Sequence, residues 1–131
     1  MIPTENPFPF DLREPVSYTA NFANTAGCAW QGLGGSVTDL NGAQFATPLQ
    51  VHVFDGAGFD RAAPTGSNSL YGGSSGWEVQ VSNAINSQIY YVQLQSSNGT
   101  QISPRIQIQF ASDCARNAAM VNFVQTRSLQ P

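Results

Sequence analysis

The chain has 131 residues, which is enough for one domain with a single hydrophobic core. Only 10% of its residues are charged, its basic residues are all arginines, and its formal net charge is -3. This composition disfavours nucleic acids and anionic membranes as partners, because both attract clusters of basic side chains. No stretch approaches the roughly 20 apolar residues that span a bilayer, so we expect no transmembrane segment.

The first 15 residues predict an N-terminal arm or linker, followed by one domain over residues 16–131. Four prolines in this arm remove backbone donors and favour extended conformations over helix. Directly after it, Val16, Tyr18, Ala20 and Phe22 alternate with polar residues, which is typical of a strand with one buried face. Such a strand completes its own sheet or pairs with the sheet edge of a neighbouring subunit.

Further segments with alternating hydrophobicity follow along the chain. They cover residues 30–38, 49–54, 77–82, 89–95, 105–110 and 119–125. Glycines in the first of these segments indicate a bulge or a close backbone approach. We expect a long loop over residues 55–69, and a turn near Ala115–Ala118 is the one helical candidate. About seven short strands without an amphipathic helix predict an all-β fold, a single antiparallel β-sandwich with an extended N-terminal arm.

The two cysteines, Cys28 and Cys114, predict a disulfide formed in an oxidising environment. A bridge between them closes a loop of about 87 residues, which stabilises the fold by roughly 4 to 5 kcal/mol in the chain-entropy model. The alternative is a pair of buried free thiols. Structural zinc sites use four ligands, so two cysteines and one histidine predict no metal centre, and we expect no cofactor.

The residues of the chain do not form a recognisable catalytic set. His52 is the one conventional general base near neutral pH, and its position opposite Val51 and Val53 places it on the solvent face or under a loop. The absence of lysine excludes Schiff-base chemistry and phosphate-loop binding. We therefore expect a protein that is not an enzyme.

Two groups of residues are candidates for ligand binding. Asp39 with Asn41, and Asp55 with Asp60, offer oxygen ligands for calcium, although Asx turns explain both groups more simply. Several aromatic residues offer a platform for sugar rings, although such residues are more often part of a core: Trp30, Trp77, Tyr71, Tyr90 and Tyr91. The candidate ligand surface comprises Asp55, Asp60, Arg61 and Tyr71, on or beside the predicted loop.

Two resemblances support an extracellular β-sandwich. The run Gly35–Gly42, followed by Leu49, Val51 and Val53 and by Gly76–Val79, resembles the carboxypeptidase-regulatory-like and transthyretin-like domains. Residues 21–32, Asp113-Cys114 and residues 121–125 resemble an uncharacterised domain of secreted or lipid-anchored bacterial surface proteins. These resemblances imply an Ig-like or transthyretin-like, non-catalytic domain that is secreted or displayed on the cell surface.

The leading hypothesis is therefore a structural or interaction module that self-associates into a homopolymer. In its most specific form the chain is a filament subunit whose N-terminal arm adds a strand to a neighbour. The residues assigned to this arm are Phe8, Phe10, Val16, Tyr18 and Phe22. The alternative is a monomeric, stalk-borne domain that binds a glycan or another surface protein.

Overall fold

The structure, a computed structural model, describes residues 7–128 and has an all-β fold within them. Its strands are β1 (Phe10–Leu12), β2 (Ser17–Thr19), β3 (Gln31–Gly35), β4 (Val37–Thr38), β5 (Gln50–Phe54), β6 (Asp60–Pro64), β7 (Trp77–Ser82), β8 (Ile89–Gln95), β9 (Ile106–Gln109), β10 (Ala118–Met120) and β11 (Phe123–Gln125). Two short 3-10 helices, η1 (Ser69–Tyr71) and η2 (Cys114–Arg116), lie between strands. The second contains part of the turn predicted near Ala115–Ala118.

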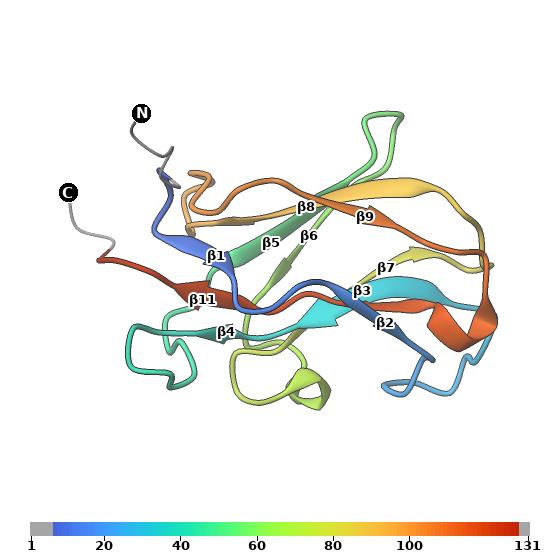
Figure 1. Ribbon diagram of the computed structural model, residues 1–131, viewed down its shortest axis with the longest axis horizontal. Coiled ribbons are helices and arrows are strands. Elements are labelled where there is room, and N and C mark those ends of the chain that lie inside the picture. The colour runs from blue at the N-terminus through green and yellow to red at the C-terminus, as the bar shows by residue number, and fades with distance from the viewer. Residues whose placement is uncertain (1–6, 129–131) are drawn as a thin grey trace.

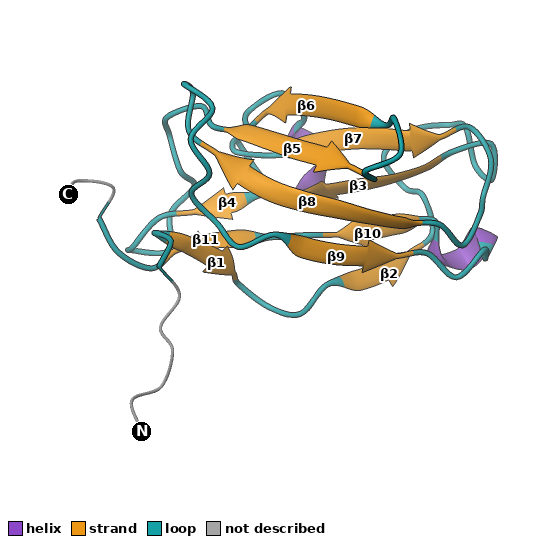
Figure 2. Ribbon diagram, turned by 90° about the horizontal axis from the view of Figure 1, so that it is seen from above, coloured by secondary structure: helices purple, strands orange, loops and turns teal. Residues whose placement is uncertain are grey.

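The strands form two layers that pack face to face (Figures 1 and 2). One layer is the sheet β6-β5-β8-β9, which is antiparallel throughout. The other layer joins the sheets β2-β10-β3-β7 and β1-β11-β4 end to end, because β1 leads into β2, β3 into β4 and β10 into β11. This arrangement is consistent with a β-sandwich.

The predicted count of seven strands is wrong, since the described residues form eleven. Two of the extra strands arise where one predicted segment is interrupted, between β3 and β4 and between β10 and β11. At Ser36, between β3 and β4, the side chain of Asn122 replaces a ladder partner: its Oδ1 accepts the Ser36 amide at 2.9 Å. The Phe123 amide then donates to the Ser36 carbonyl at 2.9 Å, which starts the pairing of β11 with β4.

The predicted loop over residues 55–69 is also wrong in part, because it contains β6. This strand has the sequence Asp-Arg-Ala-Ala-Pro and is mostly exposed, so it lacks the alternation that marks a half-buried strand. Its position at the edge of the sheet tolerates Pro64, since an edge strand needs donors on one side only. The sheet pairing with β5 therefore overrides the loop-like composition.

The sequence pattern predicts antiparallel pairing throughout, but two strand pairs are parallel. β10 runs parallel to β3, and β11 runs parallel to β4. β10 lies between β2 and β3, and β11 lies between β1 and β4, so the last strands of the chain occupy interior positions. Local periodicity contains no information about strand order, which explains the difference.

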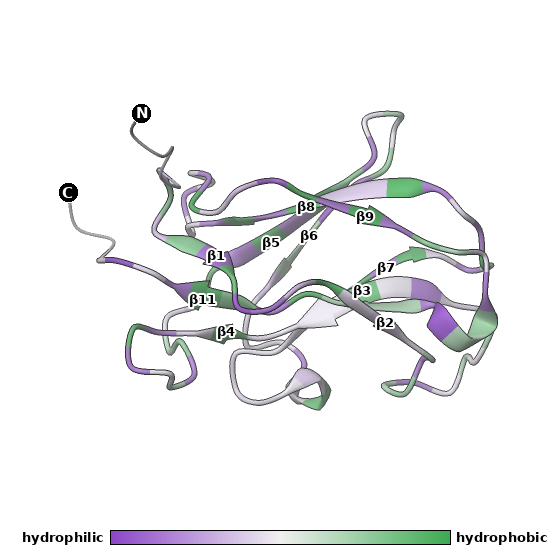
Figure 3. Cartoon of the chain, in the orientation of Figure 1, coloured by the Kyte–Doolittle hydropathy of each residue, from purple (hydrophilic) through white to green (hydrophobic). Residues whose placement is uncertain are grey.

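The core lies between the layers and confirms the predicted inward faces of several strands. Val51 and Val53 of β5, Trp77 of β7 and Ile108 of β9 are all fully buried. Figure 3 shows apolar and polar residues alternating along β5. Each inward residue removes apolar surface from water, which stabilises the fold by roughly 25 cal/mol per Å².

Part of the predicted N-terminal arm belongs to this core. Phe10, in β1, is fully buried and packs edge to face against Phe45 with ring centroids 5.3 Å apart. β1 pairs with β11 of the same chain, and β2 pairs with β10. The sheet thus begins at residue 10, within the segment assigned to the arm, and residues 1–6 lie outside the described part of the chain. Phe22, assigned to the inward face of a strand, lies beyond β2 and is 52% exposed.

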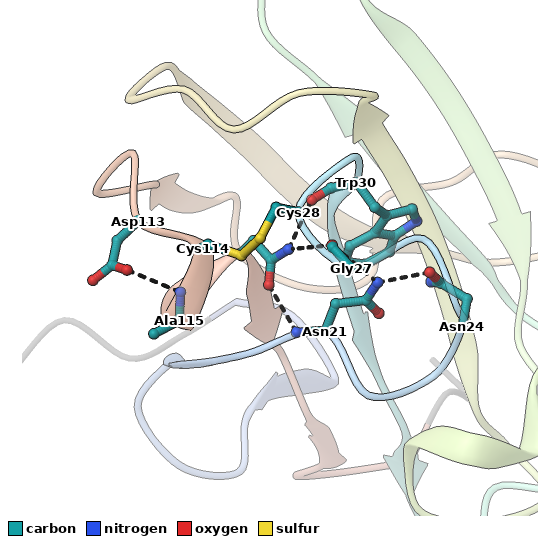
Figure 4. Close-up of a disulfide and its surroundings, with 9 residues drawn as sticks. Asn21, Asn24, Gly27, Cys28, Trp30, Asp113, Cys114 and Ala115 are labelled. Atoms are coloured by element: carbon teal, nitrogen blue, oxygen red, sulfur yellow. Dashed lines mark hydrogen bonds between the residues drawn. A yellow bond between two sulfur atoms is a disulfide. The ribbon is translucent and has the colours of Figure 1, made fainter.

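The predicted disulfide between Cys28 and Cys114 is present, with Cα atoms 5.3 Å apart. It links the loop before β3 to η2 (Figure 4). The buried Asn117 side chain fastens the same loop, since its Nδ2 donates to the carbonyls of Gly27 and Trp30, each at 2.9 Å. Over residues 7–128, no helix has the length and apolar character needed to cross a membrane.

Candidate binding surface

The outer face of the β6-β5-β8-β9 sheet carries side chains that the core does not use. Because β5 and β8 are antiparallel and in register, Phe54 lies opposite Tyr91, and His52 lies opposite Gln93. Gln50 and Gln95 form the next cross-strand pair. All six side chains are partly exposed, and the strands are rigid supports for them. Five of these side chains, together with Arg105, which contacts Tyr91, form a set that we call the outer-face row. Its members are His52, Phe54, Tyr91, Gln93, Gln95 and Arg105.

Aromatic and cationic groups stack along this row. The rings of His52 and Phe54 lie 4.7 Å apart at an interplanar angle of 31°, and those of Phe54 and Tyr91 lie 5.8 Å apart at 32°. The guanidinium carbon of Arg105 lies 4.9 Å from the centre of the Tyr91 ring, within the range of a cation–π contact. The sheet therefore presents a continuous strip of aromatic surface that ends in a positive charge.

His52 is confirmed on the solvent side of β5, where two hydrogen bonds fix its ring. Its Nε2 lies 2.8 Å from Asp60 Oδ1, and its Nδ1 lies 3.4 Å from the amide nitrogen of Gln95. Neither partner is a hydroxyl or a thiol, the groups that a histidine base deprotonates in hydrolases. The contacts orient the imidazole against the ring of Phe54.

Four of the five aromatic residues considered for a sugar platform are buried, which agrees with the simpler interpretation that such residues are part of a core. Tyr90 and Trp77 point between the layers, where they are 2% and 0% exposed. Trp30 and Tyr71 are also buried, because their rings cover glycines of β3. Tyr91 is the member that lies on the surface, whereas Phe54, which shares the outward parity of His52, was not proposed.

The four residues of the candidate ligand surface predicted from the sequence do not form one site: Asp55, Asp60, Arg61 and Tyr71. Tyr71 is buried beside β3, and its hydroxyl donates to Glu78 Oε2 at 2.7 Å. Burial and this hydrogen bond raise its pKa well above the ordinary value of 10.0. Asp60 points to the outer face, whereas Arg61 lies opposite the buried Val53 and points the other way.

The calcium candidates are occupied by turn formation. Asp39 Oδ1 accepts the amides of Asn41 at 2.8 Å and Ala43 at 3.0 Å. Asp55 Oδ1 accepts the amides of Ala57 and Phe59 at 2.8 and 2.9 Å. These contacts are Asx turns, the simpler interpretation of both groups. In the described part of the chain, no three His, Cys, Asp or Glu residues are grouped to hold a metal ion.

The chain matches no protein-family model, and no curated protein or solved structure shows significant similarity to it. The resemblance to carboxypeptidase-regulatory-like and transthyretin-like domains, and the Ig-like assignment of the fold, therefore stay predictions. The site has to be interpreted from its own chemistry.

Proposed function

We propose that this chain is a non-catalytic, extracellular binding module and that the outer-face row binds a glycan. The stacked row of rings on an exposed sheet face carries this proposal. The inward side chains of β5 and β8 already form part of the hydrophobic core. The fold therefore does not need aromatic residues on the outer face of these strands.

The chemistry of the row suits sugar rings. The C–H faces of a pyranose pack on aromatic surface, and its hydroxyls need groups that both donate and accept hydrogen bonds. Carboxamides supply both functions: Gln93 lies opposite His52, the exposed Gln107 lies opposite Tyr91, and Gln95 contacts His52. Few of these groups are charged, so their desolvation on binding costs less than that of a charged surface.

Two observations support the extracellular and non-catalytic parts of the proposal. The Cys28–Cys114 disulfide suits an oxidising compartment. The hydrogen bonds of His52 hold its ring between a carboxylate and an amide, so neither partner is a hydroxyl or thiol that the ring could deprotonate. The bacterial surface origin rests on the sequence resemblance alone.

Glycan arrays test this proposal when wild type is compared with two matched variants. Tyr91→Ser removes the ring at the centre of the row, whereas Tyr18→Ser removes a partly buried ring from the other layer. We expect wild type and Tyr18→Ser to bind the same glycans and Tyr91→Ser to lose them. Binding of proteins but of no glycan by wild type would contradict the glycan assignment, and retention of glycans by Tyr91→Ser would exclude the row.

A second candidate is self-association by exchange of the N-terminal strands, the leading hypothesis from the sequence. β1 and β2 are only three residues long each, and they lie at the edge of their layer. A neighbouring copy that supplied the same strands would form the same ladder with β11 and β10, as in domain swapping. Such an exchange makes a polymer when each chain both gives and receives the segment.

Light scattering after size-exclusion chromatography, followed by negative-stain electron microscopy, tests this second candidate. We expect molar mass to rise with concentration and filaments to form if the strands exchange. Phe8→Asp is the informative variant, because Phe8 is only partly buried. Phe10→Asp is not, since Phe10 is buried in its own chain and its loss would unfold the monomer. A constant monomeric mass at every concentration would exclude the exchange.

A further inference from the structure

A separate hollow lies where the edge strands β6 and β7 of the two layers come side by side (Figure 2). It has a volume of about 260 Å³ and is lined by Phe59, Arg61, Gln80, Val81, Ser82 and Asn83. Ligand sites for drug-sized molecules begin near 300 Å³, so this hollow has room for about one sugar ring or one amino acid.

Arg61 supplies the single charge in this lining. Its guanidinium carbon lies 5.6 Å from the centre of the Phe59 ring, which holds the cation over an apolar base. The Phe59 ring is itself fixed by an edge contact with Tyr90, at 5.6 Å between centroids. Across residues 7–128, Arg61 forms no ion pair with a carboxylate. The site therefore presents a cation that is held over an aromatic ring and has no carboxylate partner among the described residues.

The opposite wall of the hollow is polar and neutral. Gln80 Nε2 donates to the Ser82 carbonyl at 3.0 Å, which orients the carboxamide and leaves its oxygen as an acceptor. Asn83 is exposed at the rim and offers a second carboxamide. One guanidinium facing neutral donors and acceptors complements a ligand with one negative charge and several hydroxyls.

We propose that the hollow between β6 and β7 binds the carboxylate of an acidic sugar unit, with Arg61 as its anion partner and Gln80 and Asn83 as partners of the sugar hydroxyls. A carboxylate matches the planar fork of a guanidinium and needs one cation only. The site is independent of the outer-face row, since Arg61 points away from it.

NMR titration of the full chain tests the proposal with sodium glucuronate, glucose and inorganic phosphate at constant ionic strength. We expect glucuronate to give saturable shifts at the amides of residues 59–61 and 80–83, with a Kd on the order of 1 mM. Arg61→Gln should weaken this binding by about tenfold or more, the effect of losing hydrogen bonds to a charged group. Arg61→Lys should retain part of it, because the charge stays and the fork is lost.

Arg116→Gln is the matched control, because it removes an exposed arginine of η2 that belongs neither to the hollow nor to the outer-face row. We expect it to leave glucuronate binding at the hollow unchanged. Equal binding of glucose, tighter binding of phosphate, an equal loss of glucuronate binding in Arg116→Gln or the absence of saturable shifts would each overturn the carboxylate assignment. Because glycan arrays with Tyr91→Ser report on the outer-face row, failure of one site is distinguishable from failure of the other.

Discussion

Gly34 shows how a single position in β3 determines the packing of a distant aromatic residue. A Cβ atom at Gly34 would lie 2.1 Å from Tyr71 Cε1, so the Tyr71 ring rests directly on the glycine backbone. The Tyr71 hydroxyl then reaches Glu78, the cross-strand neighbour of Gly34. We expect Gly34→Ala to displace the ring and to destabilise the fold by about 1–3 kcal/mol, the usual effect of overpacking.

A double-mutant cycle measured by urea unfolding checks this prediction. In a Tyr71→Ala background the methyl group of Gly34→Ala meets no ring, so its destabilising effect should largely disappear. Additive effects of the two changes would show that the glycine is required for the backbone and not for the tyrosine.

Asp55 makes the stability of the β5–β6 turn depend on pH. The hydrogen bond from the Ala57 amide, with further bonds from Phe59 and Gln88, holds the pKa of this carboxyl below its ordinary value of 3.8. A depressed folded-state pKa gives a contribution that is complete above the unfolded pKa and lost as pH falls through the folded one. We expect the turn amides to lose protection from hydrogen exchange below the ordinary pKa. Asp55→Asn should remove this dependence, and an unchanged pH profile in that variant would contradict the assignment.

At the scale of elements, the disulfide fastens the loop before β3 to η2 across a sequence separation of 86 residues. Replacing Cys28 and Cys114 by serine should lower the free energy of unfolding by about 4–5 kcal/mol in the chain-entropy model. Urea unfolding of the variant and of the reduced wild type measures this change. The serine variant and the reduced wild type should have the same free energy of unfolding, because Asn117 keeps its hydrogen bonds to the loop in both. A loss below about 1 kcal/mol would mean that the unfolded chain is already compact.

Alternation predicted those strands that have one buried face, such as β5, β7 and β8, because burial itself creates the pattern. It missed β6, whose exposed edge position needs no apolar face. The candidate site was predicted only in part. Local sequence makes Tyr71 a candidate surface residue. It is buried because its ring packs on Gly34, which lies far away in the sequence. Phe54, in contrast, was detectable, since it shares the outward parity of His52 in β5.

At the scale of the whole molecule, the proposed function assigns stability and binding to opposite faces of the β6-β5-β8-β9 sheet. Its inward residues contribute to the core, whereas the side chains of the outer-face row are exposed or partly exposed on the other side of the sheet. Mutations on the two faces of one strand should therefore affect different properties. β8 offers the sharpest comparison, because Tyr91 and Leu94 lie three residues apart on opposite faces.

We expect Leu94→Ala, at a fully buried position, to reduce the free energy of unfolding by about 2–5 kcal/mol. Tyr91→Ser should cost only about 0.5–1.5 kcal/mol, the range for losing an aromatic pair. If the row exists for binding, Tyr91→Ser abolishes glycan retention while the protein stays folded, whereas Leu94→Ala retains glycans under conditions in which it is still folded. Thermal unfolding and glycan binding of the same preparations measure both properties. A loss of stability in Tyr91→Ser as large as that in Leu94→Ala would make the row a structural feature of the sheet, and the glycan proposal would lose its main support.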